Sequence, residues 1–266
     1  MYQLKLGKSI GFPRHMVVDA VREAVENSFD AVDLDICTLR KDRELELEEE
    51  KHLGFALETV RRSGLILNGI HISFGALWNF ANPNESLRRG AVENLRAILP
   101  TLEAYSPRCY VIHGSREPIS NEERPVQLDA LHRSLVELTA LTSTPIALEA
   151  LPRTCLFNTS AEGIAIVDAV PGVRVCVDVN HFLKEDPCDA ILALGNRIIT
   201  THISDYDFID ERHLLPGEGK IDWMRLIAAF EAIGYNGIFN YEIGKATAKE
   251  IKENYDRLFA EYNRRK

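Results

Sequence analysis

The sequence predicts a single (β/α)8 TIM barrel over residues 1–266, with its active site at the C-terminal ends of the strands. Short apolar runs of strand length alternate eight times with segments of helical periodicity. Such alternation is typical of a parallel sheet, and eight units predict a closed barrel rather than an open sheet. No Ser/Pro-rich linker or change of composition divides the chain, and 266 residues is an ordinary length for one α/β barrel.

Eight segments have the length and composition of strands. The first four are expected at residues 4–12, 29–36, 65–72 and 108–112, and the other four end at Glu149, Asp178, His202 and Glu242. Because side chains alternate along a strand, each of these four polar residues shares a face with the residue two positions earlier. In a parallel barrel the four groups would therefore converge at one rim, where barrel enzymes carry their active sites.

The helices are marked by caps and apolar stripes. Pro13 stands where the first helix begins, Gly64 follows the second, and Asp222 and Gly234 bound the seventh. The others are expected at 84–105 with a bend near Pro100, at 121–141, from an N-cap near Ser160 to before Pro171, at 188–194 and at 247–262. The acidic run at residues 44–50 is expected to form a solvated face.

The composition limits the classes of partner. The net charge of -9 and the pI near 5.5 argue against nucleic acid, because phosphate backbones are bound mainly through Lys and Arg. No apolar run approaches the roughly 18 residues that span a bilayer, so no membrane partner is expected. Assembly into a homo-oligomer is left open.

Cysteine usage indicates the compartment. The five cysteines are odd in number, widely spaced and without a C-x-x-C pair: Cys37, Cys109, Cys155, Cys176 and Cys188. This pattern argues against a disulfide framework and fits a reducing environment. The first eight residues lack the apolar core of a signal peptide, and we expect a cytoplasmic protein.

The four polar strand ends predict a metal centre. Carboxylate and imidazole together suit Mn, Zn, Co or Fe better than Ca. Three carboxylates and one histidine also leave room for a substrate to bind the same ion. We expect one divalent ion (Mn, Zn or Co) on Glu149, Asp178, His202 and Glu242, and additional ions are not excluded by the sequence.

Histidines gather at the same rim. Five of the eight follow predicted strand ends, namely His71, His113, His181, His202 and His213. The other three, His15, His52 and His132, fall on predicted helices and are expected at the surface. His181 comes three residues after Asp178; we interpret it as a donor to a substrate oxygen, with a ligand role as the alternative.

Two loops border the predicted rim. The long loop at residues 204–221 contains Arg-His213-Leu-Leu-Pro-Gly217-Glu218-Gly219 and is either a turn into the next helix or an active-site flap. Its glycines could let backbone N–H groups approach an anion, although Glu218 argues against a phosphate site. The loop after the third strand carries Phe74, Trp78 and Phe80, which either cap the barrel core or cover the apolar face of a sugar.

These residues resemble a known family. The most specific segments are Ala-Leu-Glu149, Val-Asp178-Val-Asn-His181, His202-Ile-Ser-Asp, Arg-His213-Leu-Leu-Pro-Gly-Glu-Gly-Lys-Ile-Asp-Trp and Tyr-Glu242-Ile-Gly. The chain resembles, over essentially its whole length, the xylose-isomerase-like TIM-barrel superfamily. That superfamily contains sugar phosphate isomerases and epimerases and the AP endonuclease family 2, related to endonuclease IV.

The resemblance to ketose epimerases implies a set of roles. Glu149, Asp178, His202 and Glu242 would bind one divalent metal, and Glu149 and Glu242 would also be the acid–base pair. The resemblance implies that His181 binds substrate. Further substrate contacts are expected from Arg153, His71, His113, His213 and Trp78. Leu151-Pro-Arg153-Thr-Cys155 stands where these epimerases often have an Asn-Arg-Phe-Glu-like stretch, which puts C3-epimerisation of a free ketose in doubt.

The resemblance to the endonuclease branch implies a different metal content. That branch uses three zinc ions, and its additional ligands fall on His71, His113, His181, Glu211 and His213, with Glu211 where aspartate is typical. The acidic balance of the chain and the absence of evident basic, DNA-inserting loops argue against it.

The sequence therefore predicts a metal-dependent sugar or sugar-phosphate isomerase or epimerase with a small carbohydrate substrate. It would abstract a proton next to a carbonyl through a metal-stabilised enediolate. The alternatives are an endonuclease IV-like multi-zinc phosphodiesterase, a keto-polyol dehydratase on the same scaffold, and a non-enzymatic binding barrel.

Overall fold

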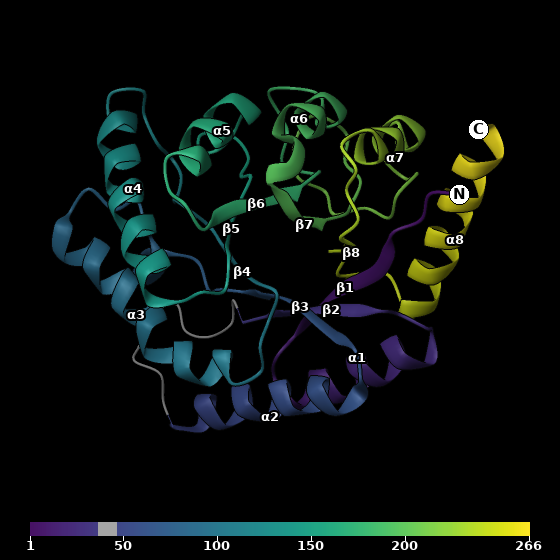
Figure 1. The fold of residues 1–266 in the computed structure, drawn as a ribbon, viewed down its shortest axis with the longest axis horizontal. Helices are drawn as coiled ribbons and strands as arrows, with labels where there is room; N and C mark the ends of the chain where they lie inside the picture. Colours follow the sequence, from purple (N-terminus) through teal and green to yellow (C-terminus); the bar gives the residue numbers. More distant parts are fainter. Residues whose placement is uncertain (37–46) are drawn as a thin grey trace.

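The structure, a computed structural model, describes residues 1–36 and 47–266 and confirms the (β/α)8 barrel. Eight parallel strands form one sheet in the order β7-β6-β5-β4-β3-β2-β1-β8, and the helices surround it (Figure 1). The strands are β1 (Lys5–Gly11), β2 (Ala31–Asp35), β3 (Ile66–His71), β4 (Cys109–Ile112), β5 (Ile146–Glu149), β6 (Val173–Asp178), β7 (Ile198–His202) and β8 (Ile238–Tyr241).

Helices alternate with these strands throughout the described residues. They are α1 (Arg14–Glu26), α2 (Leu47–Ser63), α3 (Glu85–Glu103), α4 (Arg124–Leu141), α5 (Ser160–Asp168), α6 (Pro187–Leu194), α7 (Trp223–Ala232) and α8 (Ala248–Arg265). Two short 3-10 helices are η1 (Ala76–Trp78) and η2 (Gly195–Arg197). Within the described part of the chain, no helix is both long enough and apolar enough to cross a membrane.

Most predicted helix ends agree with the structure. The Asp222 side chain accepts the backbone N–H groups of Met224 and Arg225, which makes it the N-cap of α7. One predicted cap is wrong: Thr159, rather than Ser160, caps α5, because the Thr159 hydroxyl accepts the N–H of Glu162. The solvated face predicted at residues 44–50 concerns side chains outside the described part of the chain.

The core has two layers. The outer layer lies between strands and helices; there Phe239 of β8 makes edge contacts with the rings of Phe230 and Phe259. A small cluster lies inside the barrel and consists of Cys109, Val111, Ala147 and Cys176. Ala147 and Cys176 precede Glu149 and Asp178 by two residues, so the polar strand ends lie above the inner cluster, on the same face.

The strand register brings the polar ends to the same rim. Glu149 pairs with Cys176 between β5 and β6, and Asp178 pairs with His202 between β6 and β7. Between β7 and β8 an isolated bridge replaces a regular ladder. There the backbone N–H of Ile203 donates to the Asn240 carbonyl at 2.8 Å, and that of Glu242 donates to the Ile203 carbonyl at 3.1 Å. These bonds place Glu242 next to the end of β7.

The loop between β7 and α7 is built around the buried side chain of Asp205. Its carboxylate accepts the backbone N–H of Gly217 at 2.8 Å and of Ile221 at 3.1 Å, and the indole N–H of Trp223 at 2.8 Å. A Cβ on Gly219 would lie only 2.3 Å from Asp205 Oδ1. The anion that the backbone of these loop glycines approaches is therefore the Asp205 carboxylate of the protein itself. The hydrogen bonds to Asp205 fix the conformation of the loop that carries His213.

This packing predicts opposite effects for two glycine-to-alanine substitutions. Gly219→Ala should lower the free energy of unfolding by about 1–3 kcal/mol, because the new methyl group collides with Asp205 and with the Tyr206 carbonyl. Gly54→Ala, within α2 and with nothing within 4 Å of the added Cβ, should instead raise it by roughly 0.5–1 kcal/mol. Urea denaturation of both variants measures the difference; equal effects of the two would contradict the Asp205-centred loop.

Candidate metal centre

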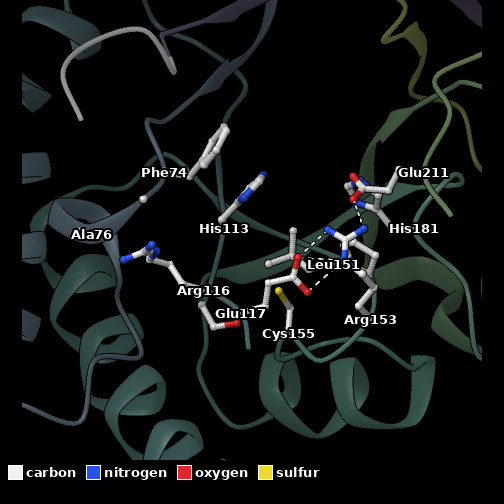
Figure 2. A pocket seen from close by; sticks show the side chains of 13 residues that line it. Phe74, Ala76, His113, Arg116, Glu117, Leu151, Arg153, Cys155, His181 and Glu211 are labelled. Atoms are coloured by element: carbon white, nitrogen blue, oxygen red, sulfur yellow. Dashed lines mark hydrogen bonds and ion pairs between the residues drawn. The ribbon is translucent and has the colours of Figure 1, made fainter. Parts of the chain in front are cut away.

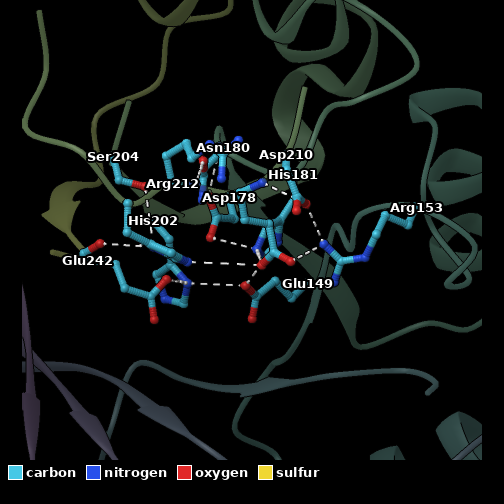
Figure 3. Close-up of polar contacts among 12 residues, drawn as sticks. Glu149, Arg153, Asp178, Asn180, His181, His202, Ser204, Asp210, Arg212 and Glu242 are labelled. Carbon is cyan, nitrogen blue, oxygen red and sulfur yellow. Dashed lines mark hydrogen bonds and ion pairs between the residues drawn. The ribbon is translucent and has the colours of Figure 1, made fainter. Parts of the chain in front are cut away.

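Four side chains meet at the rim where the sequence predicts a metal centre. Glu149, Asp178 and His202 end β5, β6 and β7, and Glu242 follows β8. One ligand atom from each lies within 4.8 Å of the others (Figure 3). The first three side chains are buried, whereas that of Glu242 is 25% exposed. Three carboxylates therefore share a small space that is largely closed to water.

Glu149 connects this group to a second one. Its Oε2 lies 2.9 Å from His71 Nε2 and 3.3 Å from His113 Nε2, while its Oε1 lies 3.4 Å from His202 Nδ1. His71, His113 and Glu149 have ligand atoms within 4.8 Å of one another. The Glu149 carboxylate thus belongs to both groups, and Glu242 also has a ligand atom within 4.8 Å of those of His71 and His202.

A third group lies on the other side of Asp178. His181, Glu211 and His213 also bring ligand atoms within 4.8 Å of one another. The Nε2 of His181 is 3.1 Å from Glu211 Oε2 and 3.4 Å from Asp178 Oδ2. The predicted candidates His71, His113, His181 and His213 are therefore all drawn to the rim, beside the four-residue centre.

Backbone carbonyls orient three of the histidine rings. The Nδ1 of His71 donates to the Ile72 carbonyl at 3.1 Å, that of His181 to Ala150 at 2.8 Å, and that of His213 to Glu242 at 3.2 Å. A carbonyl oxygen only accepts hydrogen bonds, so each Nδ1 carries a proton and each Nε2 turns toward the carboxylates. His202 is reversed, because its Nδ1 faces Glu149 and Glu242.

Burial and crowding shift the pKa values of these groups. Burial raises the pKa of Asp178 to about 6; Glu242 adds to the rise and His181 opposes it. Burial disfavours the charged form of His181, but Asp178 and Glu211 outweigh it and raise its pKa to about 10. Burial also favours the neutral acid of Glu149, yet the surrounding histidines hold its pKa well below its ordinary value. The centre therefore combines ionised carboxylate with protonated imidazole, as in the neighbouring Glu149 and His181 side chains.

The donor set fits a divalent transition-metal ion. Three carboxylates and an imidazole match the hard and borderline ligands of Mn, Zn and Co. The Oδ2 of Asp178 is buried and has no hydrogen-bond donor among the described residues. Such an atom is costly to bury without a partner, and a cation held by Glu149, Asp178, His202 and Glu242 would supply one.

A pocket opens beside the centre. It has a volume of about 620 Å³, and its walls include His113, Arg116, Arg153 and His181 (Figure 2). The ring of Phe74 stacks on His113 with centroids 4.7 Å apart and planes 12° apart. This volume lies in the range of small-molecule sites, and the wall combines one apolar face with several polar groups.

Arg153 lines this pocket but is held by three carboxylates. Its Nε donates to both Glu117 oxygens at 2.8 and 3.0 Å, and its Nη1 donates to Glu211 (Figure 2) and, at 2.8 Å, to Asp210 (Figure 3). These partners lie on the loops after β4 and β7, so Arg153 ties three loops together. The sequence gives no signal for Glu117 or Asp210, because they stand 36 and 57 residues from Arg153 on irregular segments.

The structure separates the three loop aromatics. Trp78 is 4% exposed and belongs to the hydrophobic core, as does Phe80, and neither lines the pocket. Trp78, for which the sequence predicts a substrate contact, therefore lies behind the pocket wall and not on it. Phe74, which is 39% exposed, is the aromatic side chain on the pocket wall. Apolar side chains in a loop over a barrel fill the space beneath it first, and sequence alone does not show which one faces outward.

Solved structures share this fold. A D-tagatose 3-epimerase-like protein aligns with a TM-score of 0.81 at 23% identity, covering 98% of this chain and 99% of that chain. D-Psicose 3-epimerase from Clostridium cellulolyticum H10 aligns with a TM-score of 0.75 at 18% identity over 98% and 99% of the chains. The 3-keto-D-glucoside 4-epimerase of E. coli gives 0.74 at 20% identity over 97% and 100%.

Sequence relatives and a family model define the wider group. The uncharacterized protein MJ1311 of Methanocaldococcus jannaschii is 27% identical over 186 residues, 65% of this chain and 63% of its own. Protein y4fM of Sinorhizobium fredii is 35% identical over 72 residues, 26% of this chain and 23% of its own. The chain thus spans less than two thirds of either curated relative. The family model described as xylose isomerase-like TIM barrel matches residues 21–260, and this chain belongs to that family.

Proposed function

We propose that this protein is a divalent-metal-dependent isomerase or epimerase of a sugar or sugar phosphate. The observation that carries the proposal is the convergence of Glu149, Asp178, His202 and Glu242 next to a pocket of small-molecule size. The structural neighbours named as ketose 3-epimerases and as a 3-keto-glucoside 4-epimerase support a carbohydrate substrate. One ion of Mn, Zn or Co is the proposed cofactor.

Glu149 and Glu242 are the proposed acid–base pair. Glu149 Oε1 lies 3.4 Å and Glu242 Oε2 3.1 Å from His202 Nδ1, so both carboxylates border the proposed ion. Burial favours their neutral acids, but neighbouring histidines outweigh it and hold both pKa values below the ordinary range. Both are therefore ionised near neutral pH, and either is ready to accept a proton.

The reaction would be a proton transfer at carbon. A divalent ion held by Glu149, Asp178, His202 and Glu242 would supply charge that polarises the substrate carbonyl and lowers the energy of the enediolate. One glutamate removes the proton next to the carbonyl. The other, after taking a proton from water, delivers it to the opposite face for epimerisation or to the adjacent carbon for isomerisation, and the first then releases its proton to water. His181 and His113, on the pocket wall, would orient substrate oxygens, and Phe74 would cover an apolar face.

A multi-metal phosphodiesterase is the second candidate, because two further ligand groups adjoin the first. One consists of His71, His113 and Glu149, and the other of His181, Glu211 and His213. Three ions held in this way would activate a water and stabilise the charge of a phosphoester. A keto-polyol dehydratase would use the same acid–base pair and differ in the fate of the leaving hydroxyl.

Solvent deuterium tests the proton-transfer step. In D2O, wild-type protein loaded with Mn should introduce deuterium at the exchanged carbon of its carbohydrate substrate, followed by mass spectrometry or NMR. Glu242→Gln should lower both conversion and exchange by at least about 100-fold, because the amide cannot take the proton. Glu26→Gln, at the exposed end of α1, should leave both unchanged. Conversion without deuterium uptake would indicate a hydride shift instead.

Metal content separates the two candidate functions. If the protein is an isomerase or epimerase, elemental analysis after dialysis should find one tightly bound ion per chain. Glu211→Gln should not change this number, because Glu211 belongs to the third group alone. Three ions per chain, with a loss of one in Glu211→Gln and nicking of abasic DNA by the wild type, would contradict the isomerase and support the phosphodiesterase.

The affinity for the ion should weaken in acid. The pKa of Asp178 is raised to about 6, so the metal-free protein binds a proton there as the pH falls through that value. The proton competes with the ion, and the apparent affinity should fall by about tenfold per pH unit below about pH 6. Calorimetric titration with Mn2+ between about pH 5 and 7.5 measures the slope; an affinity independent of pH would show that Asp178 is not a ligand.

A further inference from the structure

The ring of His202 is oriented differently from those of His71, His181 and His213. In the other three rings Nδ1 donates to a backbone carbonyl, whereas the Nδ1 of His202 faces the carboxylates of Glu149 and Glu242. The Nε2 of His202 points the other way, toward the barrel interior. That Nε2 is buried and has no hydrogen bond within the described residues by strict geometry. The nearest charged atom is Asp33 Oδ2, at 3.5 Å.

Asp33 is a fully buried carboxylate that belongs to none of the three ligand groups. Its Oδ1 accepts the Asn68 side-chain N–H at 2.7 Å and the backbone N–H of Gly69 at 2.9 Å. Its Oδ2 has no donor among the described residues and faces His202. Two unsatisfied buried atoms of complementary type thus face each other beneath the metal centre.

The strands around Asp33 are shaped to hold it. The register between β2 and β3 shifts after Val32, so Asn68 is an extra residue in β3, and this brings its side chain and the Gly69 N–H to the same oxygen. The Asn68 amide also donates to Thr200 Oγ1 at 2.9 Å. A Cβ on Gly69 would lie 2.8 Å from Asp33 Oδ2, so only glycine leaves room for this carboxylate.

We propose that Asp33 is a positioning residue that keeps the proton of His202 on Nε2 and thereby leaves the Nδ1 lone pair free for the metal. The inference rests on the metal centre of the proposed function. Metal-binding histidines commonly donate their second N–H to a carboxylate, which fixes the ring and its tautomer. Here the carboxylate comes from β2, across the barrel interior from the strand that carries the ligand.

The surroundings of Asp33 predict what asparagine would do in its place. Gly69 N–H and the Asn68 amide both donate to Oδ1, so the oxygen of an asparagine would remain there. Its NH2 group would then face His202 Nε2, which could only accept. The ring would adopt the Nδ1–H tautomer, and this nitrogen would no longer be available to a metal.

The test combines Asp33→Asn with a tautomer measurement on 15N-histidine-labelled protein, with the His202 signal assigned by its loss in His202→Gln. Metal-free wild-type protein should carry a proton on His202 Nε2, with or without a second one on Nδ1, and protein loaded with Zn2+ should carry a proton on Nε2 alone. Asp33→Asn should move it to Nδ1 in the metal-free protein and weaken Zn2+ binding by about 10–100-fold in calorimetric titration.

Thr200→Val is the matched control, because it removes the Asn68–Thr200 hydrogen bond and leaves Asp33 in place. It should lower stability yet keep the Nε2 proton and the Zn2+ affinity. Wild-type His202 protonated on Nδ1 alone would overturn the inference even if Asp33→Asn failed to fold, as would unchanged Zn2+ affinity in a folded Asp33→Asn. Wild-type protein that binds no divalent ion would overturn the proposed function instead, while the metal-free spectra still decide the position of the proton.

Discussion

The carboxylates of Glu149, Asp178 and Glu242 must share a space from which water is largely excluded, and the rest of the structure depends on this constraint. Each loses hydration on burial, and like charges at this separation repel. Imidazole groups compensate part of the negative charge, since His71 and His202 contact these oxygens directly. Part of the negative charge remains uncompensated, because the buried Oδ2 of Asp178 has no hydrogen-bond partner among the described residues. A divalent ion at their common centre is the partner that we propose for these groups.

Two parts of the fold hold this arrangement. The strands fix the inner half, because parallel register and the bridge between β7 and β8 hold the strand ends at one rim. The loops fix the outer half. Asp205 organises the segment that carries His213, and Arg153 ties that segment to the loops after β4 and β5. A rigid floor under a cross-linked rim suits the proposed site, which would hold an ion and admit a small molecule.

Sequence reasoning predicted the barrel and the four rim residues because both depend on short-range patterns. Strand length, alternation and the residue at each strand end can be read locally, and the barrel topology then brings Glu149 and Glu242 together. What it missed depends on irregular geometry. Trp78 lies in the core, and Arg153 pairs with carboxylates on distant loops. Asp33 faces His202 from β2, and its other oxygen is held by Asn68, the extra residue of β3. None of these contacts follows from periodicity.

The most direct test of the central claim is the anomalous-scattering map of crystals of the wild-type protein grown with Mn2+. The account predicts a strong peak bound by Glu149, Asp178, His202 through Nδ1, and Glu242, with oxygen and nitrogen ligands at about 2.0–2.2 Å. A map without a peak at this rim, or with the ion held by other residues while these four remain unbound, would contradict it.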